Sequence, residues 1–143
     1  MLIGEYKHTV DIKGRLIIPS RFREDLGAKF IITRGIGKCL FGLSLSSMER
    51  FSEKLDNLPS TDKDVLDFSR YFYSKATECE LDKQGRVLVP SVLREFAALE
   101  KDVVVTGVRT RIEIWSSDIW AAYNDNSDEM YDAMFMKMAQ LGL

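Results

Sequence analysis

The sequence predicts a mixed α+β fold built from two copies of one unit, and three observations support this prediction. Residues 11–24 and 82–95 align without a gap, and seven of the fourteen aligned positions are identical. Both segments place apolar and β-branched residues between an Asp-x-x-Gly turn and a proline, a pattern typical of a strand that leads into a helix. The remaining chain has apolar residues at helical spacing. We therefore expect a tandem duplication of a unit of about 45 residues, with short flanking helices.

Each copy is predicted to begin with a strand that runs into the Asp-x-x-Gly segment. Asp and Gly suit the first and fourth positions of a type I turn, so a β-hairpin is expected. A second strand follows, and Pro19 or Pro90 marks the start of a short helix. In the first copy this helix should end near Gly27. The predicted strands are residues 6–10, 15–18, 30–33 and 38–43 in the first copy, and 77–81 and 86–89 in the second.

Two helices are expected between the copies and one after the second copy. Ser46-x-x-Glu49 has the pattern of a capping box that opens the first helix, Pro59 should end it, and Thr61-x-x-Asp64 should open the second. We expect the apolar stripes of all three helices to pack against the protein's own sheet, with contacts between subunits as the alternative. The stripes are Met48, Phe51 and Leu55, then Val65, Phe68 and Phe72, and finally Met130, Met134 and Met138. The chain is thus divided into repeat 1 (5–47), a helical linker (48–75), repeat 2 (76–119) and a C-terminal amphipathic helix (120–143).

Length and composition favour a folded cytoplasmic protein. The 143 residues are 45% hydrophobic, but no apolar run approaches the roughly 20 residues of a membrane span. Charge appears as early as Glu5, which leaves no apolar stretch for a secretory signal. Cys39 and Cys79 are far apart, and the chain has a single His, so we expect buried free thiols without a disulfide. No metal or cofactor is expected.

Charge is distributed unevenly along the chain, although the net charge is only −2. Residues 1–34 contain seven basic and four acidic side chains, whereas residues 112–143 contain one basic and six acidic side chains. One end of the molecule can therefore face a polyanion while the other points away from it.

The sequence offers no convincing catalytic site, and we expect no enzyme. The glycine-containing segment 33–38 lacks the spacing of a phosphate-binding loop. His8 lies in a predicted strand, where a structural role is expected. The acidic side chains at Asp62, Asp64 and Asp67 are explained by a solvated helix face and a favourable helix dipole.

The most specific feature is the pair of Asp-x-x-Gly-Arg segments, each followed by three apolar residues, Pro and Ser. With segments 4–15, 76–86 and 111–115, they make the chain similar to the MraZ family, within the SpoVT/AbrB-like transcription regulators of bacteria. The resemblance covers nearly the whole chain. It implies a duplicated swapped-hairpin (AbrB-like) β-barrel and a homo-oligomeric ring. It also implies binding to repeated sites in double-stranded promoter DNA on the nucleoid, and control, as a repressor, of the division and cell-wall gene cluster.

The Asp-x-x-x-Arg motif, intact in both copies, is where the resemblance places DNA contact. Physical chemistry agrees, because a two-stranded ribbon fits the major groove and Arg can donate two parallel hydrogen bonds to guanine. The first hairpin is expected to dominate, since basic residues surround Arg15 while Glu78 and Glu80 flank Arg86. The predicted DNA-binding residues are Lys7, Lys13, Arg15, Lys83 and Arg86, and the predicted turn-shaping residues are Asp11, Gly14, Asp82 and Gly85.

Two alternatives remain open at this point. Asp11 and Arg15 could form an ordinary exposed ion pair across a hairpin, with no role beyond the turn. The chain could also be a protein-interaction module like the antitoxins that share the swapped-hairpin fold. Those proteins usually carry one copy followed by a disordered tail, whereas this sequence has two copies and a predicted helix.

Overall fold

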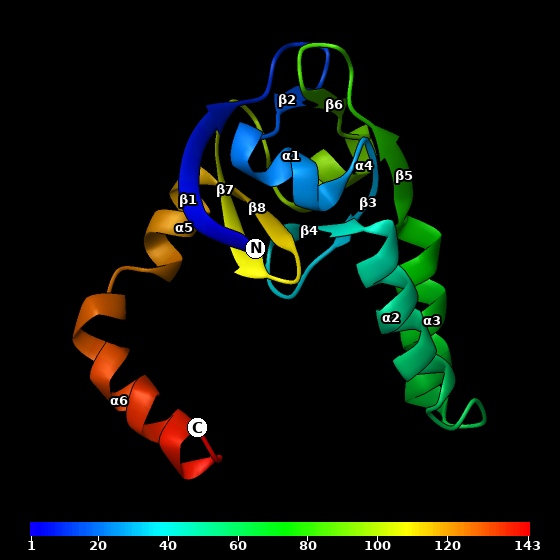
Figure 1. Cartoon of the computed structure of the whole chain (residues 1–143), viewed down its shortest axis with the longest axis vertical. Coiled ribbons are helices and arrows are strands. Elements are labelled where there is room, and N and C mark those ends of the chain that lie inside the picture. The colour runs from blue at the N-terminus through cyan, green and yellow to red at the C-terminus, as the bar shows by residue number, and fades with distance from the viewer.

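The computed structural model describes all 143 residues as a curved antiparallel sheet with a smaller sheet at one end and two helical arms (Figure 1). The strands are β1 (Leu2–Thr9), β2 (Arg15–Ile17), β3 (Lys29–Arg34), β4 (Cys39–Ser44), β5 (Thr77–Glu80), β6 (Arg86–Leu88), β7 (Asp102–Arg109) and β8 (Ile112–Ser116). The helices are α1 (Ser20–Leu26), α2 (Leu45–Asp56), α3 (Lys63–Lys75), α4 (Ser91–Phe96), α5 (Ser117–Tyr123) and α6 (Ser127–Gln140).

Strand pairing interleaves the two repeats. The six-stranded sheet has the order β1-β7-β8-β4-β3-β5, so the first strand of each repeat pairs with the third strand of the other. The fourth strands, β4 and β8, pair with each other, and so do β2 and β6 in the smaller sheet. The mixed α+β fold is therefore confirmed, and its pairing is consistent with a duplicated swapped-hairpin domain.

The helix starts predicted from the two prolines and the helix end predicted from Gly27 are confirmed. Pro19 and Pro90 each directly precede a short helix. Gly27 ends α1 with a φ of +85°, a left-handed conformation that glycine adopts without steric cost, and its N–H donates to the Arg23 carbonyl. The segment after β3, which superficially resembles a phosphate loop, is a hairpin turn in which the Gly35 N–H donates to the Cys39 carbonyl.

The predicted N-terminal caps of the two linker helices are wrong by one or two residues. Ser44 caps α2, and its side chain accepts from the Ser47 N–H. Asp62 caps α3 by accepting from the N–H groups of Asp64 and Val65. Several residues able to cap a helix adjoin at both places, and the end of β4 selects Ser44 because α2 follows that strand directly.

The apolar stripes of the helices do not all pack against the sheet. Those of α2 and α3 meet each other as well as the sheet. Phe51 of α2 is centred 5.0 Å from Phe72 and 6.3 Å from Phe68 of α3, while α2 also packs against β3 and β4, and α3 against β3. The pair forms a helical hairpin that projects from the body made by the two sheets with α1 and α4 (Figure 1). We call this body the barrel, although its six-stranded sheet is open between β1 and β5. The region expected to be one C-terminal helix is divided into α5 and α6, and no residue of α6 is buried. The prediction that the methionine stripe packs on the protein's own sheet is therefore wrong.

Both repeats contribute to a single hydrophobic core. Leu16 and Ile18 of repeat 1 are fully buried, as is Val89 of repeat 2, and Tyr6 packs edge-on against Phe22. Because the core mixes residues from both halves, neither repeat has a complete core of its own.

Both cysteines are buried and unpaired, as the sequence predicted. Burial raises the pKa of the Cys39 thiol to about 12 and that of the Cys79 thiol to about 11. Among the six helices, none combines the length and the apolar character needed to cross a membrane.

Candidate nucleic-acid interface

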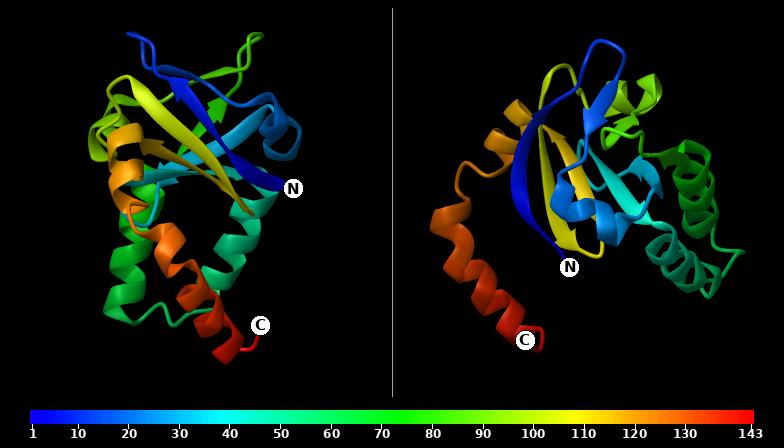
Figure 2. Two further views of the ribbon diagram at one scale, coloured as in Figure 1. Left: turned by 90° about the vertical axis from the view of Figure 1, so that its left-hand side faces the viewer. Right: turned by 45° about the horizontal axis from the view of Figure 1, so that its top comes forward.

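The two Asp-x-x-Gly-Arg segments form loops that project from the same end of the barrel (Figure 1). We call residues 11–15 loop 1 and residues 82–86 loop 2. The β2–β6 pairing joins their bases, with Ile17 opposite Arg86 and Arg15 opposite Leu88. Above this pairing the loops splay apart (Figure 2), and the side chain of Ile12 at the tip of loop 1 is fully exposed.

In loop 1 the Asp11 carboxylate organises the turn. Its Oδ1 accepts from the backbone N–H groups of Lys13 and Arg15, both at 2.9 Å. Its Oδ2 accepts from Nε of Arg15 at 2.7 Å. The backbone closes the turn, because the Gly14 N–H donates to the Asp11 carbonyl at 2.9 Å. Gly14 itself has a φ of +84°, a conformation that favours glycine.

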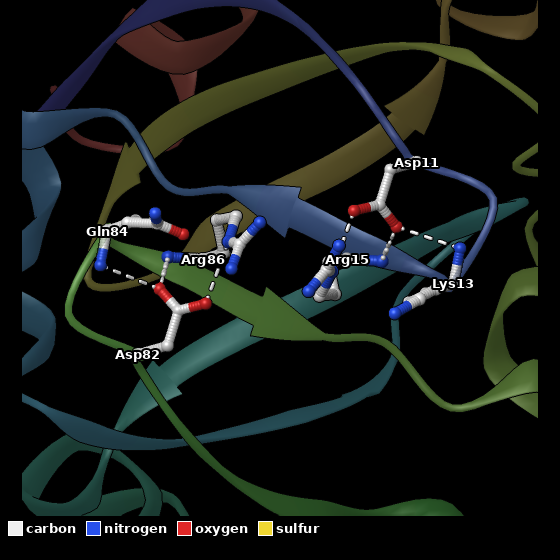
Figure 3. A network of polar contacts seen from close by, with 6 residues as sticks. All are labelled: Asp11, Lys13, Arg15, Asp82, Gln84 and Arg86. Carbon is white, nitrogen blue, oxygen red and sulfur yellow. Dashed lines mark hydrogen bonds and ion pairs between the residues drawn. The ribbon is translucent and has the colours of Figure 1, made fainter.

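Loop 2 repeats this arrangement almost atom for atom (Figure 3). Oδ1 of Asp82 accepts from the N–H groups of Gln84 and Arg86 at 2.9 Å, and Oδ2 accepts from Nε of Arg86 at 2.8 Å. Gly85 has a φ of +75°. The same network in two places indicates that the Asp-x-x-Gly-Arg sequence determines the loop conformation.

These hydrogen bonds favour the charged form of both carboxyl groups. The Arg15 backbone N–H lowers the pKa of Asp11 below its ordinary value of 3.8, and the Arg15 side chain and the Lys13 N–H lower it further. The corresponding groups of Arg86 and Gln84 lower the pKa of Asp82. Both carboxylates are therefore ionised at neutral pH.

Each loop arginine is held at one end and free at the other. The side chains of Arg15 and Arg86 keep 33% and 27% of their surface exposed. In both residues Nε is bound by the aspartate, and the two terminal nitrogens have no protein partner. A guanidinium held in this way can present two parallel donors to a planar acceptor.

The other predicted contact residues lie in different places. Lys13 and Lys83 are exposed in the loops, where a ligand can reach both side chains. Lys7 is also exposed, but it lies on β1 and lines a hollow beside Trp120 of α5. The structure therefore does not bring Lys7 into the pair of loops. His8 is partly buried on β1, and this burial, with the nearby Arg23 charge, lowers its pKa.

Sequence reasoning missed two residues that support the loops. Arg23 of α1 lies against Gly85 in loop 2, and Arg94 of α4 lies against Gly14 in loop 1. Thus each repeat supports the loop of the other. Arg23 and Arg94 occupy equivalent, identical positions of the internal repeat, and this identity was the available signal.

Backbone hydrogen bonds also cross between the repeats. The Ile18 N–H donates to the Gly85 carbonyl at 3.0 Å, and the Val89 N–H donates to the Gly14 carbonyl at 2.9 Å. Loop 2 is therefore anchored by the residue that follows β2, and loop 1 by the residue that follows β6.

Two interleaved repeats, each with an aspartate-bound arginine loop, make the chain a duplicated hairpin protein, consistent with a swapped-hairpin domain. Within that class the chain belongs to the MraZ family. The family model described as "MraZ protein, putative antitoxin-like" matches residues 1–70 and 72–140. Over all 143 residues and the full length of each relative, the chain is 54% identical to a protein of Alkaliphilus metalliredigens and 52% identical to one of Caldicellulosiruptor bescii. A relative in Thermoanaerobacter sp. is 48% identical over the same length.

All three relatives bear the name "Transcriptional regulator MraZ". That name describes a regulatory role and not an enzymatic one, in agreement with the interpretation of the sequence.

Proposed function

We propose that the protein is a sequence-specific DNA-binding transcription regulator that presents loops 1 and 2 to the major groove. The single observation that carries this proposal is the pair of matching loops at one end of the barrel, each with an arginine whose terminal nitrogens are free. Two such nitrogens match O6 and N7 of guanine. The exposed Lys13 and Lys83 would contact phosphates, and the aspartates would orient the arginines.

One subunit offers too little surface for a specific complex, because single small modules bury only about 600 to 1,000 Å² of protein surface on DNA. We therefore propose a homo-oligomeric ring in which several loop pairs bind repeated promoter sites together, which raises the effective concentration of each loop at the next site. The target implied by the family resemblance is the division and cell-wall gene cluster, and the effect is repression.

A second candidate function is a protein-interaction module of the antitoxin type. The unpacked α6, with exposed apolar side chains, is the observation that favours it. Size exclusion with and without upstream DNA separates the two functions. A large self-assembled species whose elution shifts with promoter DNA supports the regulator, and a small species that ignores DNA supports the interaction module.

Footprinting on the DNA upstream of the protein's own gene tests the proposed function directly. We expect protection of short repeats at regular spacing. The matched variant is Arg15→Ala, which should cost about 1 to 3 kcal/mol for each guanine that the arginine no longer binds, and should relax sequence preference. An intact Arg15→Ala oligomer that binds the promoter as tightly as wild type would contradict the assignment.

A further inference from the structure

Two arms extend from opposite sides of the barrel, and both point away from loops 1 and 2 (Figures 1 and 2). One arm is the α2–α3 hairpin and the other is α6. None of the residues of α6 is buried, and Met134, in the middle of the helix, is 45% exposed. A helix with so many exposed apolar side chains is expected to pack against another apolar protein surface. The large exposed apolar residues of α6 are Met130, Tyr131, Met134, Phe135, Met136 and Met138.

The opposite arm carries a groove of suitable chemistry. It consists of two adjoining hollows of about 300 and 410 Å³, which share Phe51 and Lys54 of α2. The first lies between α2 and β4 and includes Phe41, and the second lies towards the tip of the helical hairpin and includes Leu58 and Phe68. We call this continuous surface the α2 groove.

Charge makes the α2 groove and α6 complementary. Arg50 and Lys54, one helical turn apart, place positive charge along the groove, and Asp64 in the second hollow is the one acidic residue that lines it. The first turns of α6 carry Asp128, Glu129 and Asp132. An amphipathic helix with acidic side chains beside an apolar face fits a basic-rimmed apolar groove.

The lengths of the two elements also match. At 1.5 Å per residue, the 14 residues of α6 extend about 21 Å and the 12 residues of α2 about 18 Å. Methionine side chains, which α6 has in abundance, adapt to irregular apolar surfaces. An α6 placed along α2 would therefore cover the groove for most of its length.

The helix that fills the groove cannot be α6 of the same chain. Only residues 124–126 connect α5 to α6, and three extended residues reach about 10 Å. The barrel lies between α6 and the α2–α3 hairpin (Figure 1). A second copy of the chain is free of this restriction.

We propose that α6 of one subunit docks in the α2 groove of the next subunit. This inference rests on the proposed function, because it identifies the interface that would build the proposed ring. The interface is heterologous, since two different surfaces meet, and such interfaces generate closed rings when the rotation between subunits closes. Because both arms point away from the loops, this docking leaves every DNA-facing loop uncovered.

Paired charge reversals test this docking in the full-length protein. The groove variant is Arg50→Glu with Lys54→Glu, and the helix variant is Glu129→Lys with Asp132→Lys. Each should weaken assembly at least about tenfold, because like charges then face each other, and light scattering should shift towards the 16.4 kDa subunit mass. The matched control, Glu49→Lys with Glu53→Lys, changes residues of α2 that do not line the groove and should assemble like wild type.

An equimolar mixture of the two variants is the decisive sample. In alternating order, a reversed groove meets a reversed helix and an unaltered groove meets an unaltered helix, so we expect large assemblies to return. Circular dichroism confirms that each variant is folded. Normal assembly of either variant alone, or no recovery in the mixture of folded variants, would overturn the docking proposal. If either result is obtained while the wild-type protein forms a ring that binds promoter DNA, only the docking proposal fails. If the wild-type protein neither assembles nor binds DNA, the proposed function is contradicted as well.

Discussion

The guanidinium of Arg94 lies directly against Gly14, with Cζ 2.8 Å from the position that a Cβ on Gly14 would occupy. Nε of Arg94 donates to the Val89 carbonyl, and the N–H of Val89 donates to the Gly14 carbonyl. The helix of repeat 2 therefore holds loop 1 through side chain and backbone together. Arg23, Ile18 and Gly85 form the equivalent arrangement at loop 2.

Replacing Gly14 by Ala should damage loop 1 in two separable ways. The φ of +84° costs an L-residue about 1 to 2 kcal/mol, and the new Cβ also collides with Arg94. We expect urea unfolding to show a loss of stability larger than the cost of the φ angle alone. The collision should disappear in an Arg94→Ala background.

The matched control is Gly27→Ala, at a φ of +85° but with its nearest atom 3.6 Å away. It should show the cost of the φ angle and the small change in the α1 cap without any collision. An equal cost of Gly14→Ala with and without Arg94 would mean that the guanidinium does not support the loop.

Lys13→Ala should weaken binding to all DNA sequences alike. Lys13 is exposed at the tip of loop 1, where a phosphate contact releases counterions. Titrations against promoter and scrambled DNA at several salt concentrations should show a salt slope smaller by about one. A change in sequence preference with an unaltered slope would show that Lys13 binds a base instead.

Arg86→Ala should weaken promoter binding about as much as Arg15→Ala, by about 1 to 3 kcal/mol for each guanine that is no longer bound. The sequence favoured dominance of the first hairpin, partly because Arg23 follows Arg15 closely in the chain. The structure removes that reason, because Arg23 lies against Gly85 in the other loop. Parallel titrations of the two variants, with oligomer size checked, decide the matter. A weakening confined to one variant would show that only one loop binds bases.

Acid should disorder the loops at a pH below the ordinary aspartate range. The pKa of Asp11 is lower in the folded loop than its usual 3.8, so its stabilising effect is fully present above 3.8 and is lost as pH falls through the lower, folded value. Carboxyl carbon NMR should follow this titration. In Arg15→Ala the pKa should rise but stay below 3.8, because the backbone N–H of residue 15 remains. An Asp11 pKa of 3.8 or more in wild type would contradict the loop network.

Arg34 of β3 contacts both α3 and α4, so we expect it to stabilise the packing of these two helices against the sheet. Its Cζ lies 4.4 Å from the ring centre of Tyr71 on α3 and 4.5 Å from that of Phe96 at the end of α4. Arg34→Ala should lower the free energy of unfolding by about 1 to 3 kcal/mol and speed hydrogen exchange in α3. Arg34→Met should recover part of this stability, because it keeps the apolar stem and removes a buried Nε without a partner. Unchanged stability of Arg34→Ala would rule out this role.

The sequence predicted those features that depend on local interactions. The Asp11 and Asp82 networks join residues at most four positions apart, so the repeated motif was sufficient to place both loops. The support by Arg23 and Arg94 could not be predicted in the same way, because it depends on which strands of the two repeats pair.

The helix predictions show the same division. The periodicity of α6 predicted a helix correctly, but periodicity does not reveal whether a face meets its own chain, and no residue of α6 is buried. The caps at Ser44 and Asp62 were missed because neighbouring residues have equal capping ability, and the exact start depends on how the preceding segment ends.

Because β2 and β6 belong to two repeats of one chain, the two loops that they join need not have the same sequence. A dimer of identical subunits must display two identical loops, which suits a palindromic operator. Here the two paired loops differ, with Ile12 and Lys13 in one and Lys83 and Gln84 in the other. Each loop could therefore change during evolution without altering its partner, and the fused pair is suited to DNA in which the two halves of a site are not mirror images.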